Sequence, residues 1–242
     1  MKDNPAAFDL SVIVPCFNEE GNIPLLLERT QKTLSEAGIN GEIILVDDAS
    51  SDRTAELIRA AEAERPNVRG CFHKVNQGIV GGWRTGLAAS SGKYVVTIDA
   101  DLQYQPEDIA VLFKAMDPAL CDLVQGWRRF SSENHRIRYI LSVGLSGMLN
   151  VLFGMRLKDI KSGFVLYKKE VFEDILTYKK DYLVFQHFIT IAADAKGYRV
   201  RQVPVKFERR YAGESFITRP IRFSLKVLQD LPKALAEYRF GK

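Results

Sequence analysis

The sequence predicts a single α/β domain in which helices flank a mainly parallel β-sheet. Its 242 residues are 46% hydrophobic and 26% charged, a composition typical of a globular protein with one substantial core. Short β-branched segments alternate with segments whose apolar residues have helical spacing. This alternation is typical of parallel sheets that are covered by helices on both faces.

The regular part of the pattern occupies the first half of the chain. There the expected strands are 10–14, 43–46, 68–72 and 94–98, and the expected helices between them are 23–37, 52–64 and 81–90. The second half is less regular, and its expected strands are 123–126, 164–167 and 200–205. No linker separates the halves, and the sequence contains no internal repeat.

The two halves differ in charge. Residues 1–120 carry 11 Lys and Arg against 18 Asp and Glu, whereas residues 121–242 carry 23 against 12. The acidic half can hold a metal ion, and the basic half can bind phosphates or an anionic membrane surface. Three cysteines without CxxC spacing argue against a disulfide framework or a zinc site. The first residues lack the pattern of a signal peptide, so we expect a cytoplasmic protein.

A polar loop follows each of the first four expected strands. The loops read PCFNEE, DDASSD, NQG and DADLQ. In open α/β sheets, ligands bind where the loops at the carboxyl ends of the strands meet at a switch in strand order. We therefore expect these four loops to line one crevice.

Two pairs of aspartates in these loops have a structural and a functional interpretation. Asp52 can cap the next helix, but the adjacent carboxylates of Asp47 and Asp48 repel each other unless hydrogen-bond donors or a cation offset the repulsion. The side chains of Asp99 and Asp101, two residues apart, can face one Mg²⁺ or Mn²⁺ ion. The alternative is that Asp101 only begins a turn into the next helix.

Four ordered segments resemble glycosyltransferase family 2. They are SVIVPCFNEEGNIPLLL, EIILVDDASSDRTAELI, NQGIVGGWRTGLAASSGKYVVTIDADLQ and DIKSGFVLYKKEV. Within this family the chain is most similar, from residue 9 to residue 215, to the dolichyl- and polyprenyl-phosphate mannose and glucose synthases. The resemblance implies a Rossmann-like GT-A fold and an inverting sugar transfer from a nucleoside-diphosphate sugar, helped by Mg²⁺ or Mn²⁺.

The resemblance also implies roles for residues of the polar loops. Asp47 would contact the base, and Asp101 and Gln103 would hold a metal ion on the diphosphate, together with Asp99. The candidate donor-binding residues are Pro15, Asn18, Glu20, Asp47, Asp48, Asn76, Gly78 and Asp99. Because a departing nucleoside diphosphate gains negative charge, a cation held by Asp101 would stabilise it.

An apolar segment at 137–155 lies among basic residues of the second half. Its uncharged part, 139–155, is close to the lower limit of roughly 17–25 residues for a membrane-spanning helix. Three alternatives stay open: a buried core helix, a spanning helix, or an interfacial helix whose small and polar side faces the enzyme while its apolar side enters a membrane surface. That small and polar stripe consists of Ser142, Ser146, Gly147, Asn150 and Gly154.

A later segment, VKFERRYAGESF, resembles the R-x-x-G-x-S segment of the lipid-phosphate mannose synthases. Arginine suits a phosphate because its planar guanidinium donates two hydrogen bonds, and a solvated loop is the alternative. The sequence departs from the family at Phe216, where lysine is usual, and at Val165, where arginine is frequent. The candidate acceptor-binding residues are Arg128, Arg129, Arg138, Ser162, Arg210 and Ser215.

Asp159, in LKDIKSGF, matches an acidic family position near the acceptor. A lipid phosphate is largely ionised at neutral pH and hardly needs a general base, whereas a sugar hydroxyl usually does. We expect Asp159 to orient or weakly assist a phosphate nucleophile; the alternative is an ion pair with Arg128 or Lys161. The candidate catalytic residues are thus Asp101, Arg128, Asp159 and Arg210.

The expected function is sugar transfer to a polyprenyl phosphate at the cytoplasmic face of a membrane. The expected organisation is a glycosyltransferase domain over 1–215, with a donor half (1–120) and an acceptor half (121–215), and a basic amphipathic tail over 216–242. The enzyme is either peripheral or anchored by a separate membrane subunit, and no nucleic acid partner is expected. The alternatives are a family 2 enzyme with a hydroxyl acceptor and a non-catalytic nucleotide-sugar-binding protein. A sugar nucleotidyltransferase would need a glycine-rich loop where this chain has PCFNEEGN.

Overall fold

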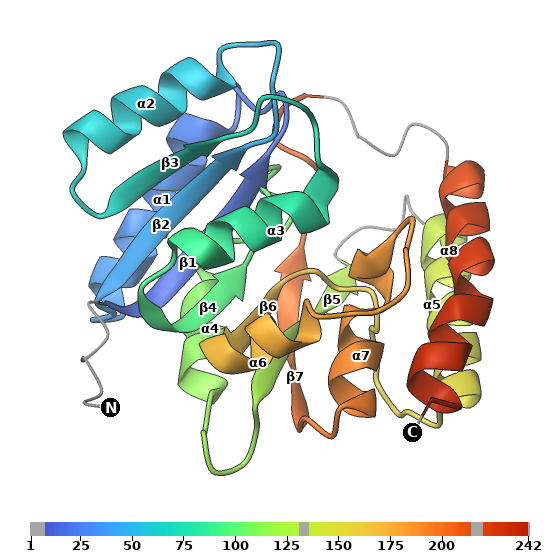
Figure 1. The fold of residues 1–242 in the computed structure, drawn as a ribbon. Coiled ribbons are helices and arrows are strands. Elements are labelled where there is room, and N and C mark those ends of the chain that lie inside the picture. Colours follow the sequence, from blue (N-terminus) through green and yellow to red (C-terminus); the bar gives the residue numbers. More distant parts are fainter. Residues whose placement is uncertain (1–7, 131–135, 214–219, 242) are drawn as a thin grey trace.

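The computed structural model describes residues 8–130, 136–213 and 220–241 (Figure 1). Within these ranges, the side chains of 129–130, 136–143 and 220–224 lie outside the description. Helices lie on both sides of a twisted sheet, and a helical pair stands at one end of the molecule (Figure 1).

Seven strands form one sheet with the order β3-β2-β1-β4-β6-β5-β7. β1, β2, β3 and β4 run parallel, as do β5 and β7, whereas β6 is antiparallel to both β4 and β5. The expected α/β fold with a mainly parallel sheet is therefore confirmed, with β6 as the exception. The strands are β1 (Phe8–Cys16), β2 (Gly41–Asp47), β3 (Val68–Phe72), β4 (Gly92–Thr97), β5 (Leu123–Phe130), β6 (Val165–Lys168) and β7 (Val200–Phe207).

The helices connect these strands and cover both faces of the sheet. α1, α2 and α4 pack on one face, and α3, α5, α6 and α7 pack on the other. They are α1 (Ile23–Glu36), α2 (Thr54–Glu64), α3 (Gly78–Ala89), α4 (Asp108–Ala115), α5 (Arg136–Phe153), α6 (Lys169–Ile175), η2 (Phe185–His187), α7 (Ile189–Ala195), α8 (Pro220–Ala234) and the π-helical η3 (Leu235–Arg239).

The central strand β1 shows why both faces are covered. Successive side chains of a strand point to opposite faces. In β1, Leu10, Val12 and Val14 enter the core beneath α1 and α2, while Ile13 enters the core beneath α3, and all four are completely buried. A continuous apolar run of this kind predicts a strand that is buried on both faces.

The strand order positions the polar loops. β1 lies between β2 and β4, so the sheet grows in one direction through β2 and β3 and in the other through β4. The loops that follow the carboxyl ends of β1, β2 and β4 therefore open on the same edge, at a switch in strand order. Three of the four polar loops thus lie at one edge of the sheet, and a crevice between them stays a prediction.

Helix α5 occupies the expected apolar segment, and it buries part of its apolar side together with part of the small-residue stripe. Leu149 and Phe153 are buried against the core, whereas Gly147 and Gly154 of the small-residue stripe are exposed. Ser146 is buried, so only part of the stripe faces the protein. The larger apolar side chains gain more from leaving water than glycines do, which decides the orientation. In the described part of the chain, no helix is both long and apolar enough to cross a membrane.

Candidate functional site

The loops after β1, β2 and β4 share an unusual backbone feature. Among the described residues, three non-glycine residues have a positive φ: Asn18 (55°), Ala49 (63°) and Leu102 (59°). One of them lies in each of the three loops. Side chains rarely adopt this conformation because the Cβ atom crowds the backbone, and such strain is concentrated at functional sites.

Side chains of the first loop bond directly to the second loop. Oδ1 of Asn18 accepts a hydrogen bond from the backbone N–H of Ser51 at 2.8 Å, and the hydroxyl of Ser50 accepts one from the N–H of Asn18 at 2.9 Å. The Glu20 carboxylate accepts the N–H of Arg53 at 2.9 Å. Asn18 and Glu20, two of the residues predicted to bind the donor sugar nucleotide, thus hold the first and second loops together.

The aspartate pair after β2 is divided between two environments. The carboxylate of Asp48 accepts the N–H groups of Gln77 at 2.7 Å and Gly78 at 2.8 Å, and it contacts Nδ1 of His73 at 2.7 Å. Asp48 therefore anchors the N-terminus of α3, where Gly78 has a φ of 73°. The neighbouring Asp47 is also buried, and its carboxylate accepts the N–H of Ser50 at 3.3 Å.

Asn76 completes this group, because its side-chain amide donates to the carbonyl oxygen of Asp48 at 3.2 Å. Pro15, in β1, lies close to Gly82 of α3, where a Cβ atom would come within 2.9 Å of the proline ring. The structure therefore brings the predicted donor residues of β1, β2 and the β3–α3 loop to one side of the molecule. Their roles toward a nucleotide stay predictions.

Asp99 and Asp101 follow β4, and their carboxyl groups influence each other. Oδ1 of Asp101 accepts the N–H of Gln103 at 3.0 Å, and only 6% of Asp101 is exposed. Burial and the charge of Asp101 raise the pKa of Asp99 to about 7, and burial also raises the pKa of Asp101. A bound cation would reverse both effects because it favours the ionised carboxylates.

Arg210 joins two carboxylates from different loops. Its Nη1 lies 2.9 Å from Oε1 of Glu19, and its Nη2 lies 3.0 Å from Oδ2 of Asp101. Burial raises the pKa of Glu19, and Arg210 opposes this shift. Asn22 also donates to the Glu19 carboxylate. Glu19 is thus a third acidic residue of the site, which the sequence analysis did not include.

The segment after β7 lies along the DADLQ loop. The N–H of Glu208 donates to the carbonyl oxygen of Gln103 at 2.9 Å, and the Gln103 side-chain amide donates to the carbonyl oxygen of Glu208 at 3.2 Å. The carbonyl oxygen of Ala212 accepts the Asn22 side-chain amide at 3.2 Å. The expected R-x-x-G-x-S segment therefore borders the acidic loops, although its last residue, Ser215, lies outside the described residues.

The acidic residues suit a hard divalent cation that is shared with a substrate. In the described ranges, no three or more His, Cys, Asp or Glu side chains group around one point as a complete metal site. Mg²⁺ is usually bound by one or two carboxylates together with substrate phosphates and water. Asp99 and Asp101, with the side-chain oxygen of Gln103, would supply such a partial set of oxygen ligands, and this role stays a prediction. The residues present therefore fit a cation that arrives with a diphosphate.

A second charged group lies at the ends of β5 and β6. Nε and Nη2 of Arg128 contact the two carboxylate oxygens of Asp159 at 2.6 and 3.0 Å. Burial works against the charge of Asp159, but Arg128 outweighs it and holds the pKa of Asp159 below its usual value. Burial and the charge of Arg128 lower the pKa of Lys161 to about 8, and burial, Lys161 and Arg128 lower the pKa of His187 to about 3. This group therefore combines the Arg128–Asp159 ion pair with the amine of Lys161 and a His187 that is neutral at pH 7.

The remaining predicted acceptor residues differ in what the structure says of them. Ser162 is completely buried, and its hydroxyl lies 2.9 Å from that of Tyr104. It therefore contacts the core side of the site. Arg129 belongs to β5 and Arg138 to α5, but both side chains lie outside the described residues. The link through Tyr104 connects the DADLQ loop to the Arg128 region.

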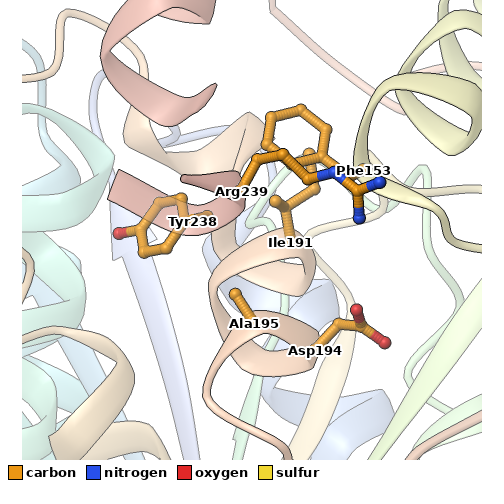
Figure 2. A pocket seen from close by; sticks show the side chains of 6 residues that line it. All are labelled: Phe153, Ile191, Asp194, Ala195, Tyr238 and Arg239. Atoms are coloured by element: carbon orange, nitrogen blue, oxygen red, sulfur yellow. The ribbon is translucent and has the colours of Figure 1, made fainter. Parts of the chain in front are cut away.

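A small cavity of about 40 Å³ lies elsewhere, between α5, α7 and η3 (Figure 2). Its volume is enough for on the order of one to a few water molecules. It is far too small for a nucleotide sugar, so it is not the donor site. The residues that line it are Phe153, Ile191, Asp194, Ala195, Tyr238 and Arg239.

Solved structures share this architecture. A mannosyltransferase from Pyrobaculum calidifontis, in complex with GDP-Man and Mn²⁺, matches 95% of this chain and 64% of its own with a TM-score of 0.70 and 21% identity. Glucosyl-3-phosphoglycerate synthase from Mycobacterium tuberculosis, in complex with Mn²⁺ and UDP-glucose, matches 96% of this chain and 80% of its own with a TM-score of 0.67 and 19% identity. The likeness confirms the expected GT-A fold.

The chain is also similar in sequence to known transferases. An undecaprenyl-phosphate 4-deoxy-4-formamido-L-arabinose transferase from Photorhabdus laumondii subsp. laumondii is 31% identical over 207 residues, which are 85% of this chain and 62% of that protein. The protein of the same name from Edwardsiella ictaluri is 33% identical over 208 residues, with the same shares. The chain thus spans less than two-thirds of the length of these relatives. The model of glycosyl transferase family 2 matches residues 11–176, and the chain belongs to this family.

Proposed function

We propose that the protein transfers a sugar from a nucleoside-diphosphate sugar to a polyprenyl phosphate at the cytoplasmic face of a membrane. The observation that carries the proposal is that two charged groups lie at the same edge of the sheet, because β4 and β5 are both antiparallel to β6. The carboxylates of Asp99 and Asp101 form the donor side, and Arg128 with Lys161 forms a basic acceptor side. The names of the relatives support a polyprenyl-phosphate acceptor.

In the proposed reaction, an oxygen of the lipid phosphate attacks the anomeric carbon of the sugar. The new bond forms as the bond from that carbon to the nucleoside diphosphate breaks, with inversion at the carbon. When bound at Asp99, Asp101 and Gln103, Mg²⁺ or Mn²⁺ would stabilise the charge on the departing diphosphate. Asp47 would orient the base, and Arg210, whose terminal nitrogens pair with Glu19 and Asp101, would place its positive charge beside the phosphates.

The state of Asp159 favours a phosphate acceptor over a hydroxyl acceptor. A general base that deprotonates a sugar hydroxyl works best with a pKa close to the working pH. The bidentate contact with Arg128 instead keeps the pKa of Asp159 low. Asp159 is therefore suited to orient Arg128 toward an anionic nucleophile, which needs no strong base.

The outer surface of α8 and η3 supports the membrane part of the proposal. Leu225, Leu228 and Phe240 are 51%, 47% and 75% exposed, and the exposed side also carries basic residues such as Lys226. The acidic residues of this region turn inward. Asp230 is completely buried, and Glu237 accepts hydrogen bonds from the backbone of Lys179 and Lys180. A surface that combines apolar and basic side chains suits an anionic bilayer.

A direct assay tests the function. The protein is incubated with UDP- and GDP-sugars, Mn²⁺ and a short polyprenyl phosphate, and the lipid is analysed by mass spectrometry. We expect the mass of one sugar to be added to the lipid phosphate with at least one donor. Transfer to water-soluble saccharides without any lipid product would favour a hydroxyl acceptor, and donor binding without any turnover would favour a non-catalytic role.

A further inference from the structure

Two glutamines lie side by side next to the segment that carries Asp159. Gln125 of β5 and Gln202 of β7 are register partners in adjacent parallel strands. Gln125 is completely buried, and Gln202 is partly buried. A polar amide in such a position destabilises the fold unless its hydrogen bonds are satisfied. The bonds that the two amides make therefore indicate what they do.

The first of these bonds links the two side chains to each other. Nε2 of Gln202 donates to Oε1 of Gln125 at 2.8 Å. Nε2 of Gln125 in turn donates to Oγ1 of Thr190, in the first turn of α7, at 2.9 Å. Because each amide both donates and accepts, neither can rotate by 180° without placing like atoms face to face. The orientation of the pair is thus fixed.

The other bonds all go to the backbone of one short segment, 158–162. Oε1 of Gln202 accepts the N–H of Lys158 at 2.7 Å, and Nε2 of Gln202 donates to the carbonyl oxygen of Asp159 at 3.1 Å. Nε2 of Gln125 donates to the carbonyl oxygen of Ser162 at 3.0 Å. Two side chains thus hold the segment at its beginning, middle and end.

The same segment carries the charged residues of the basic group. Asp159 makes the bidentate contact with Arg128, and Lys161 follows two residues later. Hydrogen bonds from glutamine to the backbone fix where these residues stand without adding any charge of their own. A displacement of the segment by about 1 Å would misplace both Asp159 and Lys161, and errors of this size can cost on the order of a hundredfold in rate.

We infer that Gln125 and Gln202 are positioning residues, which hold the 158–162 segment in the shape that binds the acceptor phosphate. The inference rests on the proposed function for the identity of the acceptor, but the effect on the segment itself is independent of it. Neither glutamine contacts the donor loops in the described structure, so the two residues should affect the acceptor and leave the donor unchanged.

The test replaces the donating amides by carboxylates of equal size. In Gln202→Glu, an oxygen faces Oε1 of Gln125 and the carbonyl oxygen of Asp159, so two bonds become repulsive. Gln125→Glu has the same effect at Ser162. Gln31→Glu on α1, where the amide contacts Asn67, makes the same chemical change far from the site and serves as the control.

Hydrogen–deuterium exchange of the protein alone gives the first result. Peptides that cover 157–164 should exchange about tenfold faster in Gln202→Glu than in the wild type, while peptides over 41–52 stay unchanged. Steady-state transfer gives the second result: the KM for polyprenyl phosphate should rise about tenfold, with the donor KM unchanged. The control variant should match the wild type in both measurements.

Unchanged exchange at 157–164, or an equal rise of both KM values, would overturn the inference. If the glutamate variants do not fold, Thr190→Val keeps the shape of the core and removes one acceptor from Gln125; faster exchange at 157–164 is still expected, and its absence would overturn the inference equally. A wild-type protein that transfers no sugar to lipid phosphate would refute the proposed function, whereas the exchange result alone decides whether the glutamines hold the segment.

Discussion

Three residues in unfavourable backbone conformations, Asn18, Ala49 and Leu102, lie one in each of the loops that follow β1, β2 and β4. Each positive φ costs on the order of 1–3 kcal/mol, and the neighbouring contacts must offset this cost. Asn18 gains hydrogen bonds to the second loop, and Leu102 gains burial of its side chain. Ala49 has neither a polar side chain nor full burial, so it is the residue at which the strain can be tested most simply.

We expect Ala49→Gly to stabilise the protein by about 0.5–1 kcal/mol. Glycine adopts a φ of 63° without steric cost, and this gain exceeds the extra chain entropy that glycine loses on folding. Chemical denaturation measures the change. Ala88→Gly, at an exposed helical position of α3, is the matched control and should destabilise by about 0.5–1 kcal/mol. If both substitutions destabilise equally, the loop is not strained at Ala49.

Some residues of the candidate site could be identified from the sequence, and others could not. The motifs identified the acidic loops, because aspartates two apart at a strand end are conspicuous in a sequence. They selected Glu20 and not Glu19, because adjacent glutamates look alike in a sequence and only the folded chain shows that Glu19 pairs with Arg210. The bond from Arg210 to Asp101 joins segments that only the folded chain brings together. The roles of the predicted site residues stay predictions.

At the scale of elements, one carboxylate connects three strands of the acceptor half. Asp122 immediately precedes β5, and it pairs with Lys168 at the end of β6 at 2.6 Å and with Arg199 just before β7 at 3.0 Å. The hydrogen bonds from Arg199 and Lys168 hold the pKa of Asp122 well below its usual value. The ion pairs therefore fix the edge of the sheet on which Gln125 and Gln202 lie.

We expect Asp122→Asn to lower the Tm by roughly 2–5 °C at neutral pH. Because the folded state depresses the pKa, the stabilisation is complete above the unfolded pKa of about 3.9 and is lost as the pH falls through the folded value. The difference in Tm between wild type and variant should thus shrink below about pH 4. Thermal unfolding from pH 7 to pH 2.5 measures it.

The exposed pair of Arg53 and Glu56 on α2 provides the control for this prediction. Their side chains are 67% and 63% exposed, so Glu56→Gln should leave the Tm unchanged at every pH. A difference between Asp122→Asn and the wild type that stays constant down to pH 2.5 would show that the charge of Asp122 is not the stabilising feature.

The elements themselves could be predicted because long β-branched runs and helical spacing are strong local signals. The position of β6 between β4 and β5 was not predictable, since strand order depends on long-range packing. For α5 the sequence left three arrangements open, and in the structure Leu149 and Phe153 are buried together with Ser146. A stripe of small residues is compatible with either face pointing inward, and the large apolar residues Leu149 and Phe153 determine which face is buried.

At the scale of the whole molecule, the charge asymmetry matches the division of the site. The acidic half carries the loops proposed to hold the cation and the donor, and the basic half carries Arg128, Lys161 and the outer surface of α8, as well as Arg210, which pairs with the acidic loops. Such a division would let one protein hold a metal-bound nucleotide on one side and an anionic lipid on the other. In the proposed function, membrane contact would involve α8 and η3.

We expect Leu225→Ser with Leu228→Ser to reduce binding to vesicles on the order of tenfold, because both leucines are about half exposed on α8. Co-sedimentation with phosphatidylglycerol and phosphatidylcholine vesicles measures the bound fraction. Leu120→Ser, at a site that is 66% exposed and distant from α8, is the control and should bind like the wild type. Equal binding of all three proteins would exclude α8 as the membrane surface.

In the proposed function, the acidic loops bind the donor diphosphate together with its cation. Calorimetric titration of UDP and GDP, with and without Mn²⁺, is the most direct test of this binding. The comparison uses the wild type, Asp101→Asn, and Asp9→Asn at the exposed opposite end of β1. We predict that Mn²⁺ lowers the Kd for the nucleotide in the wild type and in Asp9→Asn. In Asp101→Asn, the factor by which Mn²⁺ lowers the Kd should be at least about tenfold smaller. Equal Mn²⁺-dependent binding by all three proteins would contradict the assignment of the site.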